Sequence, residues 1–469
     1  MRPITLRSAV EQLDLLRRRQ ISPLELAEEH IRAITAWNPA LHAIVAWDAD
    51  EIREQARQLE RSGGHRGPLA GLPVTIKSSI PVAGRPCSLG SHLRRNAIAA
   101  QDATVVARLR AAGAIILGIT NCPEFLMAYE SDNLLHGRTS NPWNLAATVG
   151  GSSGGESAAI AAGLSTAGFG SDSGGSVRVP AHFTGICSLK PTPGRIPAFD
   201  HQPPCYGPFS ILGAIGPMAR TMADIALLFG AVAGQSLDDP QGSPVLLRPC
   251  ALDEARQIPV GYFEDDGLVP VTAETRVAVQ AAVQALKNRG FQVHTFRPPS
   301  LEEARRLWWK FFVRGGAMFV RSAIAEAREP VSPVLQDFLD IAGEEPPLSG
   351  DELLNAWFEC DTVRQQLLRE MREFPILLCP ACAIPAFGHG ERSWQIDGVT
   401  VRYLDAMRYT QWFNLLGAPA AVVPVGQSQS GMPIGVQIAG RPYQDEAVMA
   451  VASVVDQAFG YQPPPLLFA

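Results

Sequence analysis

Two clusters of glycine and serine lie close together in this chain and carry hydroxyl groups that can act as nucleophiles. The stretch from Gly150 to Ser176 reads GGSSGGESAAIAAGLSTAGFGSDSGGS, with an Ala-rich run between the clusters. Glycine loses more backbone freedom on folding than any other residue, so such a high density of glycine predicts that the backbone itself must lie close to a ligand. Consecutive N–H groups in the second cluster, Ser173–Ser176, can converge on an anion as in an oxyanion hole.

Three interpretations of these clusters compete on the residues alone. A phosphate-binding loop is disfavoured because the stretch lacks Gly-Lys-Ser/Thr and contains no lysine. Both clustered serines, Ser152 and Ser153, match the G-x-S-x-G elbow of a Ser-His-Asp esterase of the α/β-hydrolase type. None of the downstream histidines has a setting that marks it as the base: His182, His201, His294 and His389. A glycine-rich turn without catalysis is the third interpretation.

A longer match extends over nearly the whole chain. The run from Gly150 to Arg195 resembles the signature of the amidase signature family. LAGLPVTIKSSI, starting at Leu69, resembles the lysine strand of that family, and LGITNCPEF and GRTSNPWN resemble its next two segments. FNLLGAPAAVVPVGQSQSGMPIGVQIAGRPYQDE is similar to its closing strand pair.

The resemblance implies a catalytic set and a fold. Carried over residue by residue, the catalytic residues are Lys77, Ser152 and Ser176, with Ser176 as the nucleophile and a cis peptide bond before Ser152. The backbone N–H groups that would bind the oxyanion are those of Ser173, Gly174, Gly175 and Ser176. The implied fold is a single α/β/α domain over 1–469 with a mixed, mostly parallel sheet covered by helices, a signature core at about 65–240 and a C-terminal sheet and helices at about 370–460.

The chemistry of this set follows from the side chains. A serine hydroxyl is a poor nucleophile until a base removes its proton. Lysine serves as that base only when neutral, and burial favours the neutral amine. Lys77 follows the apolar run Leu72–Ile76, which predicts a buried position. The expected reaction is hydrolysis of a carboxylic amide through an acyl-enzyme, with esters and carbamates as further substrates, and it needs no metal and no cofactor.

Departures from the family pattern bear on the substrate. Val179 follows Arg178, and Pro193-Gly194-Arg195 stands where Tyr-Gly-Arg is usual, which argues against a glutaminyl amidotransferase subunit. Ser78 replaces an acidic residue that many members carry after the lysine. Glu156 and the segment MAYESDNLLHGRTSNPWN, which starts at Met127, resemble the fatty-acid-amide-hydrolase-like branch, which places three residues near an apolar acyl or aryl pocket: Leu126, Met127 and Tyr129. The aromatic cluster Trp308–Phe312 is a lid, a membrane contact or core; these alternatives stay open.

The elements that must position these residues follow from apolar periodicity and capping signals. A strand is expected at Val74–Ile76, and a helix at 102–113 leads into a strand at 114–120. Further helices are expected at 5–36 (two, the second starting at Ser22-Pro23 with a capping box), 48–62, 156–164, 222–234, 273–290, 301–328 and 444–459. Further strands are expected at 292–296, 375–379, 420–424 and 431–439.

Composition limits the class of protein. The 469 residues are 46% hydrophobic and 18% charged with net charge −6, which predicts a sizeable core. No basic block indicates nucleic acid, and no apolar run reaches the roughly 18 residues of a membrane helix or forms a signal peptide. We therefore expect a cytoplasmic enzyme that acts on a small-molecule amide; a homodimer stays open. The eight cysteines, with Cys379 and Cys382 in a CxxC, are expected to be buried thiols rather than a disulfide or zinc framework.

Overall fold

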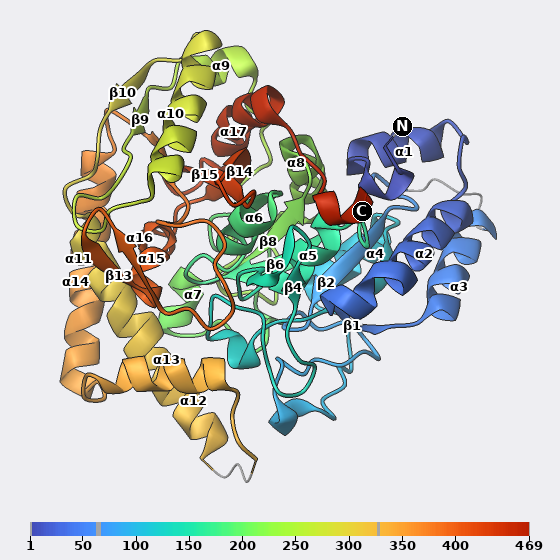
Figure 1. Ribbon diagram of the computed structural model, residues 1–469, viewed down its shortest axis with the longest axis horizontal. Coiled ribbons are helices and arrows are strands. Elements are labelled where there is room, and N and C mark those ends of the chain that lie inside the picture. Colours follow the sequence, from blue (N-terminus) through green and yellow to red (C-terminus); the bar gives the residue numbers. More distant parts are fainter. Residues whose placement is uncertain (1, 62–66, 326–328, 469) are drawn as a thin grey trace.

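A large mixed sheet forms the middle of the molecule. The computed structural model describes residues 2–61, 67–325 and 329–468 (Figure 1). Within these ranges an 11-stranded sheet runs in the order β1-β3-β2-β6-β8-β7-β14-β15-β11-β9-β10. Its strands are β1 (Ile44–Trp47), β2 (Pro73–Lys77), β3 (Ile115–Thr120), β6 (Ala167–Asp172), β7 (Cys187–Lys190), β8 (Ala214–Ala219), β9 (Val260–Tyr262), β10 (Val293–Thr295), β11 (Ile376–Pro380), β14 (Ala420–Gln427) and β15 (Pro433–Gly440).

The expectation of a mixed sheet is confirmed, but the expectation that it is mostly parallel is wrong. Among the described strands, the parallel pairings are β3 with β2, β2 with β6, β11 with β9, and β9 with β10. The other six neighbour pairings are antiparallel. The helix-then-strand pattern at 102–120 gives a parallel pair locally, whereas β14 and β15 join through a short turn and must run antiparallel.

Helices cover both faces of the sheet. Around the N-terminal half lie α1 (Ala9–Arg17), α2 (Pro23–Leu41), α3 (Ala49–Arg61), α4 (Thr104–Ala111), α5 (Gly154–Ala161), α6 (Arg178–Thr184), α7 (Pro208–Leu212) and α8 (Met222–Val232). The second half adds α9 (Leu252–Arg256), α10 (Ala273–Asn288), α11 (Leu301–Trp308), a π-helical segment η4 (Trp309–Gly315), α12 (Gly316–Ile324), α13 (Pro333–Gly343), α14 (Gly350–Glu370), α15 (Tyr403–Ala406), α16 (Arg408–Leu416) and α17 (Asp445–Phe459). Single-turn 3₁₀ segments and two small sheets, β4 (Ser140–Asn141) with β5 (Asn144–Thr148) and β12 (Ser393–Ile396) with β13 (Val399–Arg402), complete the chain.

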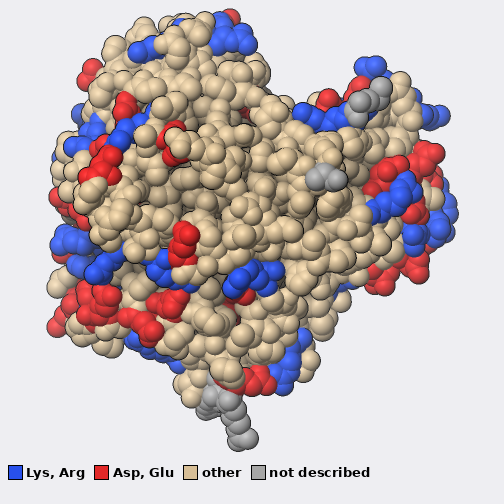
Figure 2. Space-filling model, in the orientation of Figure 1, with Lys and Arg blue, Asp and Glu red and all other residues tan. Residues whose placement is uncertain are grey.

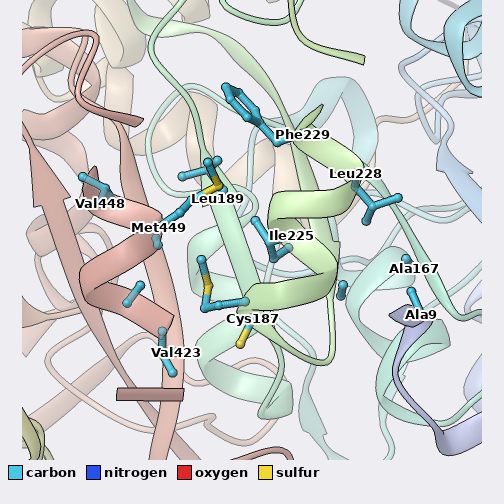
Figure 3. Packing of buried hydrophobic residues seen from close by; sticks show 14 of the residues in the cluster. Ala9, Ala167, Cys187, Leu189, Ile225, Leu228, Phe229, Val423, Val448 and Met449 are labelled. Carbon is cyan, nitrogen blue, oxygen red and sulfur yellow. The ribbon is translucent and has the colours of Figure 1, made fainter. Parts of the chain in front are cut away.

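The main core lies between the sheet and the helices on one face. Figure 3 shows Ile225, Leu228 and Phe229 of α8 beside Cys187 and Leu189 of β7, with Val448 and Met449 of α17 and Val423 of β14 nearby. All of these side chains are buried. The core therefore joins segments more than 200 positions apart in the sequence.

Most of the expected elements are confirmed within one to four residues at each end. Ser22 and Glu25 form the predicted capping box at the start of α2, because each side chain accepts a hydrogen bond from the other residue's backbone N–H. The expected helix at 301–328 is present as α11, η4 and α12, and residues 326–328 lie outside the described residues, as does residue 62 at the end of the expected helix at 48–62. The region near 240–255 is a loop followed by the short helix α9.

Charged side chains of both signs lie mostly toward the sides of the face seen in Figure 2, and a broad area at its centre is uncharged. Each helix in the described part of the chain is too short or too polar to cross a bilayer. All eight cysteines are free thiols; six are buried and two, Cys205 and Cys250, are half-buried.

Candidate active site

Lys77 lies at the carboxyl end of β2, between β3 and β6, and its side chain is fully buried. Its Nζ donates to Ser152 Oγ over 2.6 Å and lies 3.1 Å from Ser171 Oγ. Burial lowers the pKa of Lys77 to about 8, although neighbouring acidic groups oppose the shift. A substantial fraction of this amine is therefore neutral near physiological pH and able to accept a proton.

The two Gly/Ser clusters are joined to each other through the backbone. The Gly151–Ser152 peptide bond is cis, as the resemblance implies, and α5 starts two residues later at Gly154. The N–H of Ser153 donates to the carbonyl of Ser176 over 3.0 Å, and Ser153 Oγ lies 3.3 Å from the carbonyl of Ser171. The Ala-rich helix thus connects two loops that lie side by side at the end of the sheet.

Ser176 opens onto a cavity of about 430 Å³. Ser152, Ser171 and Ser173 line the same cavity, and Ser176 is 8% exposed. No hydrogen bond joins the hydroxyls of Ser152 and Ser176 among the described residues. The structure therefore brings Lys77 and Ser152 into direct contact and Ser176 to the wall of the cavity beside them.

Asp172 holds the loop that carries Ser176. Its carboxylate accepts from the N–H groups of Gly175 and Val177 at 2.8 and 3.1 Å, and it pairs with Arg178 at 2.8 Å, with both side chains fully buried. Burial alone would raise the pKa of Asp172, but the charge and hydrogen bonds of Arg178 outweigh it and keep the pKa well below its usual value. Gly175, expected as an oxyanion donor, has its N–H directed at this carboxylate in the structure.

The predicted pocket residues divide into two groups. Leu126 and Met127 line the cavity, as expected. Tyr129 is buried beside the loop instead, where its hydroxyl donates to the carbonyl of Gly174 over 2.7 Å. Tyr129 therefore lies near the cavity, as expected, but contacts the loop rather than the cavity wall. The remaining cavity wall is mostly aromatic and proline side chains, together with a histidine and a cysteine: Phe125, His201, Pro203, Pro204, Cys205, Tyr206, Pro208, Phe209, Phe312 and Phe319.

The aromatic cluster Trp308–Phe312 is core on one side and cavity wall on the other. Trp308 and Phe311 are fully buried. Phe312, in η4, lines the cavity and stacks on Trp308 with ring centroids 4.9 Å apart and planes 12° apart. A membrane-contact role has no support in this packing.

No histidine in the described part of the chain serves the esterase alternative. Both ring nitrogens of His182 contact backbone groups, at 3.0 Å from the carbonyls of Gly435 and Ile384. His201 lines the cavity, but its Nδ1 donates to the carbonyl of Pro203 over 2.9 Å, and burial lowers its pKa to about 4. Within the described ranges, no histidine nitrogen hydrogen-bonds to Ser152, Ser153 or Ser176. The basic side chain that contacts a signature serine is that of Lys77.

Three contacts at this site are missing from the sequence-based prediction. Ser171 contacts Lys77, Thr410 Oγ1 donates to the carbonyl of Gly174 over 2.6 Å, and Trp308 Nε1 donates to the carbonyl of Ser173 over 2.8 Å. The proximity of Ser171 to the second cluster is a signal that the sequence contains. Thr410 and Trp308 come from α16 and α11, more than 100 residues further along the chain. No local pattern marks Thr410, and the aromatic cluster marks Trp308 without indicating its contact with the loop.

The described residues contain no group of three His, Cys, Asp or Glu side chains arranged to hold a metal ion. Cys379 and Cys382 of the CxxC are fully buried, and Cys379 Sγ accepts from Gln437 Nε2 at 3.4 Å. Both thiols are part of the core.

Comparison with known proteins gives a consistent family. A family model described as "Amidase" matches residues 25–449. An indoleacetamide hydrolase of Bradyrhizobium diazoefficiens is 32% identical, with 97% of this chain and 87% of that protein covered. An acylamidase of Rhodococcus erythropolis is 33% identical, with 95% and 94% covered.

Relatives with other names match about as well. A glutamyl-tRNA(Gln) amidotransferase subunit from Roseiflexus castenholzii is 32% identical over 96% of this chain and 95% of that protein. A human fatty-acid amide hydrolase 2 is 28% identical over 98% and 90%. The crystal structure of a bacterial aryl acylamidase superposes with a TM-score of 0.86 at 28% identity, and 97% of each chain is covered. Overall identity therefore does not separate these activities.

Proposed function

The chain belongs to the amidase signature family and is an amidase, a hydrolase of carbon–nitrogen bonds, and from that premise we propose that Lys77, Ser152 and Ser176 are its catalytic residues. The observation that carries the proposal is the 2.6 Å contact between the buried Lys77 amine and Ser152 Oγ, at the wall of the cavity that Ser176 lines. A base with a pKa of about 8 beside a hydroxyl matches what general-base catalysis requires near neutral pH.

The reaction proceeds in two acyl-transfer steps. Ser176 Oγ attacks the amide carbonyl carbon, while its proton passes to Ser152 Oγ and the Ser152 proton passes to Lys77 Nζ. When the tetrahedral intermediate collapses, the C–N bond breaks and Lys77 returns the proton through Ser152 to the leaving nitrogen. Water then attacks the acyl-enzyme by the same relay and releases the carboxylic acid and Ser176. The Ser152–Ser176 contact must close on substrate binding, as catalytic hydrogen bonds commonly do.

The backbone N–H groups of Ser173, Gly174 and Ser176 would stabilise the oxyanion. Gly175 is left out because its N–H donates to Asp172. Donors that are fixed before the reaction stabilise the developing charge without reorganising, which is why a rigid loop matters here.

We further propose that the substrate has an apolar acyl or aryl group, as in the fatty-acid-amide-hydrolase-like branch. The cavity of about 430 Å³ falls within the range of small-molecule sites, and phenylalanine, leucine, methionine and proline side chains form most of its wall. Such a wall favours burial of apolar substrate surface at roughly 25 cal/mol per Å². Esters and carbamates with the same acyl group are expected as further substrates, since they offer the same carbonyl to Ser176.

Replacement of the nucleophile tests the catalytic assignment. Ser176→Ala is expected to lower turnover of an aryl anilide by at least about 10⁴-fold, because no other hydroxyl replaces the attacking atom. The matched control is Ser453→Ala on α17, whose hydroxyl donates only to the carbonyl of Met449. Circular dichroism and the melting temperature establish that both variants fold, and intact-mass analysis of the wild type with a slow ester should find an acyl adduct on Ser176. Full activity of Ser176→Ala contradicts the proposal.

A substrate panel distinguishes the amidotransferase alternative. The purified chain should hydrolyse aryl and alkyl amides without any partner protein. If it instead releases ammonia from glutamine only in the presence of partner proteins, the amidotransferase assignment holds and the apolar substrate class is wrong.

A further inference from the structure

The loop that carries the nucleophile is held from outside by three side chains that donate to two consecutive carbonyls. Trp308 Nε1 donates to the carbonyl of Ser173 over 2.8 Å. Tyr129 and Thr410 donate to the carbonyl of Gly174 over 2.7 and 2.6 Å. These contacts fix the orientation of the two peptide units that follow Ser173 and Gly174.

The orientation of each peptide unit decides where its N–H points. Both units are trans, since the cis bonds within the described residues are those before Ser152 and Pro203. In a trans peptide the C=O and N–H point in opposite directions. The Gly175 N–H is thereby directed at Asp172, and the Gly174 N–H is directed away from Trp308. No acceptor within the described ranges takes the Gly174 N–H, which leaves it available to a substrate oxygen.

Trp308 is built into this position. It is fully buried, it stacks on Phe312, and it ends α11 where the chain continues as the π-helical segment η4. Its ring also lies directly against the loop, because a Cβ at Gly174 would be 2.6 Å from Trp308 Cζ2. A glycine at 174 is therefore what allows the indole to approach the Ser173 carbonyl.

We propose that Trp308 is a positioning residue for amide hydrolysis: its indole N–H holds the Ser173–Gly174 peptide so that the Gly174 N–H faces the substrate oxyanion. The inference rests on the proposed function, in which this loop binds the oxyanion. Because the Gly175 N–H is engaged elsewhere, the Gly174 N–H is one of few donors left, and its orientation has a correspondingly large effect. Trp308 itself does not line the cavity, so it acts on the reaction through the peptide.

The test removes the donor and keeps the ring. Trp308→Phe is expected to lower kcat for an aryl anilide by about 10- to 100-fold, the scale of a small displacement of a catalytic group. KM should stay within about twofold, since Phe312 still forms the cavity wall. A trifluoromethyl ketone, which forms a tetrahedral adduct, should bind more weakly by about the same factor as the loss in kcat/KM. The carboxylic acid product should bind as it does to the wild type.

The neighbouring tryptophan supplies a matched control. Trp309 Nε1 donates to Glu345 Oε1 over 2.9 Å at the exposed side of η4, away from the loop. Trp309→Phe should leave kcat, KM and ketone affinity unchanged. The pH at which activity is half-maximal should also stay the same in Trp308→Phe, because the substitution leaves Lys77 in place. A variant that is merely misfolded in part would contain less active enzyme, but each active site would bind the ketone as tightly as the wild type does.

Two further measurements keep the outcomes distinct. If Trp308→Phe does not fold, incorporation of 3-benzothienylalanine at position 308 keeps the indole shape and replaces the N–H by sulfur, and the same loss of kcat is expected. Labelling by a fluorophosphonate reports the proposed function: labelling of wild type at Ser176 supports it, and absence of labelling contradicts the nucleophile assignment itself. Normal labelling together with wild-type kcat and ketone affinity in the donor-free variants overturns the role of Trp308 alone.

Discussion

At the scale of single residues, the site depends on what burial does to charged groups. Among the described residues Lys77 forms no ion pair with a carboxylate and its nitrogen faces two serine hydroxyls, so desolvation outweighs the opposing acidic groups and lowers the pKa of the amine to about 8. Asp172 is equally buried, but Arg178 and two backbone N–H groups keep it ionised. Burial therefore shifts Lys77 toward the neutral amine, which can accept a proton. Asp172 stays an ionised carboxylate, which can hold the loop.

The pH dependence of catalysis follows from Lys77. A proton-accepting amine must be deprotonated, so kcat/KM should rise about tenfold per pH unit on the acid side and level off above an apparent pKa of about 8. Lys77→Ala should remove this rise of kcat/KM with pH and lower kcat by several orders of magnitude. The measurement is a pH–rate profile between pH 5 and 10 with a neutral amide, and Lys310→Ala, whose amine pairs with Glu359 on the surface, is the control. A profile for the wild type that is flat from pH 6 to 9 contradicts the assignment of Lys77 as the base.

At the scale of elements, the glycines of the second cluster have a different cause from the one that the sequence suggests. The high density of glycine predicts a backbone that a ligand can approach closely. In the structure, however, a Cβ at Gly174 would meet Trp308, and a Cβ at Gly175 would lie 2.3 Å from Thr410 Oγ1. Gly175 also has φ +124°, which side chains rarely adopt. The two glycines therefore leave room for the side chains of α11 and α16 that hold the loop. Of the two glycine N–H groups, only that of Gly174 has no acceptor among the described residues.

The π-helical segment η4 places an aromatic side chain at the cavity. Phe312 stacks on Trp308 and makes edge contacts with Phe209 and Phe338, with ring centroids 6.4 Å apart in each case. Phe312→Leu should lower kcat/KM for an aryl amide about tenfold relative to an acetamide, since loss of a ring contact in a pocket costs about 1–3 kcal/mol. The check is the ratio of the two specificity constants, with Phe358→Leu on the exposed surface of α14 as the control. An unchanged ratio means that the acyl group does not occupy this part of the cavity.

Local sequence signals recover some elements here and not others. The capped helix α2 and the apolar strands β2 and β3 carry their own signals in capping residues and β-branched side chains. β6 (AGFGSD) and β8 (AIGPMA) are poor in such residues, and they are strands because each pairs with the other along its whole length. In these two strands tertiary pairing overrides weak propensity.

At the scale of the whole molecule, one sheet joins the two halves of the chain. β7, from the signature region, pairs with β14, and α8 packs beside α17. Asp445 at the start of α17 accepts from Thr192 N and Oγ1 at 2.8 Å and pairs with the buried Arg195. We propose on this ground that 1–469 behaves as a single domain.

Cleavage of the long connecting loop tests that proposal. Leu237 and Leu246 are 97% and 85% exposed, so a protease site placed between them should be cut in the folded protein. The two pieces should stay associated in size-exclusion chromatography and keep most of the amidase activity, because their shared sheet and core are intact. Residues 1–242 expressed alone should lack a cooperative thermal transition, since β7 would keep β8 but lose β14, its partner on the other side. Independent folding of that piece contradicts the single-domain proposal.

The sequence by itself indicated the family, and it singled out the lysine and the two serines that we propose as catalytic, because these lie in short segments whose residue order is distinctive. It also determined the strand that carries Lys77, since a continuous apolar run forms a buried strand with little help from elsewhere. Only the tertiary structure decided which N–H groups of the loop stay free, that Tyr129 and Trp308 hold the loop, and that most strand pairs are antiparallel. Those features depend on groups that meet across long stretches of chain, and no local pattern records which distant carbonyl a donor will reach.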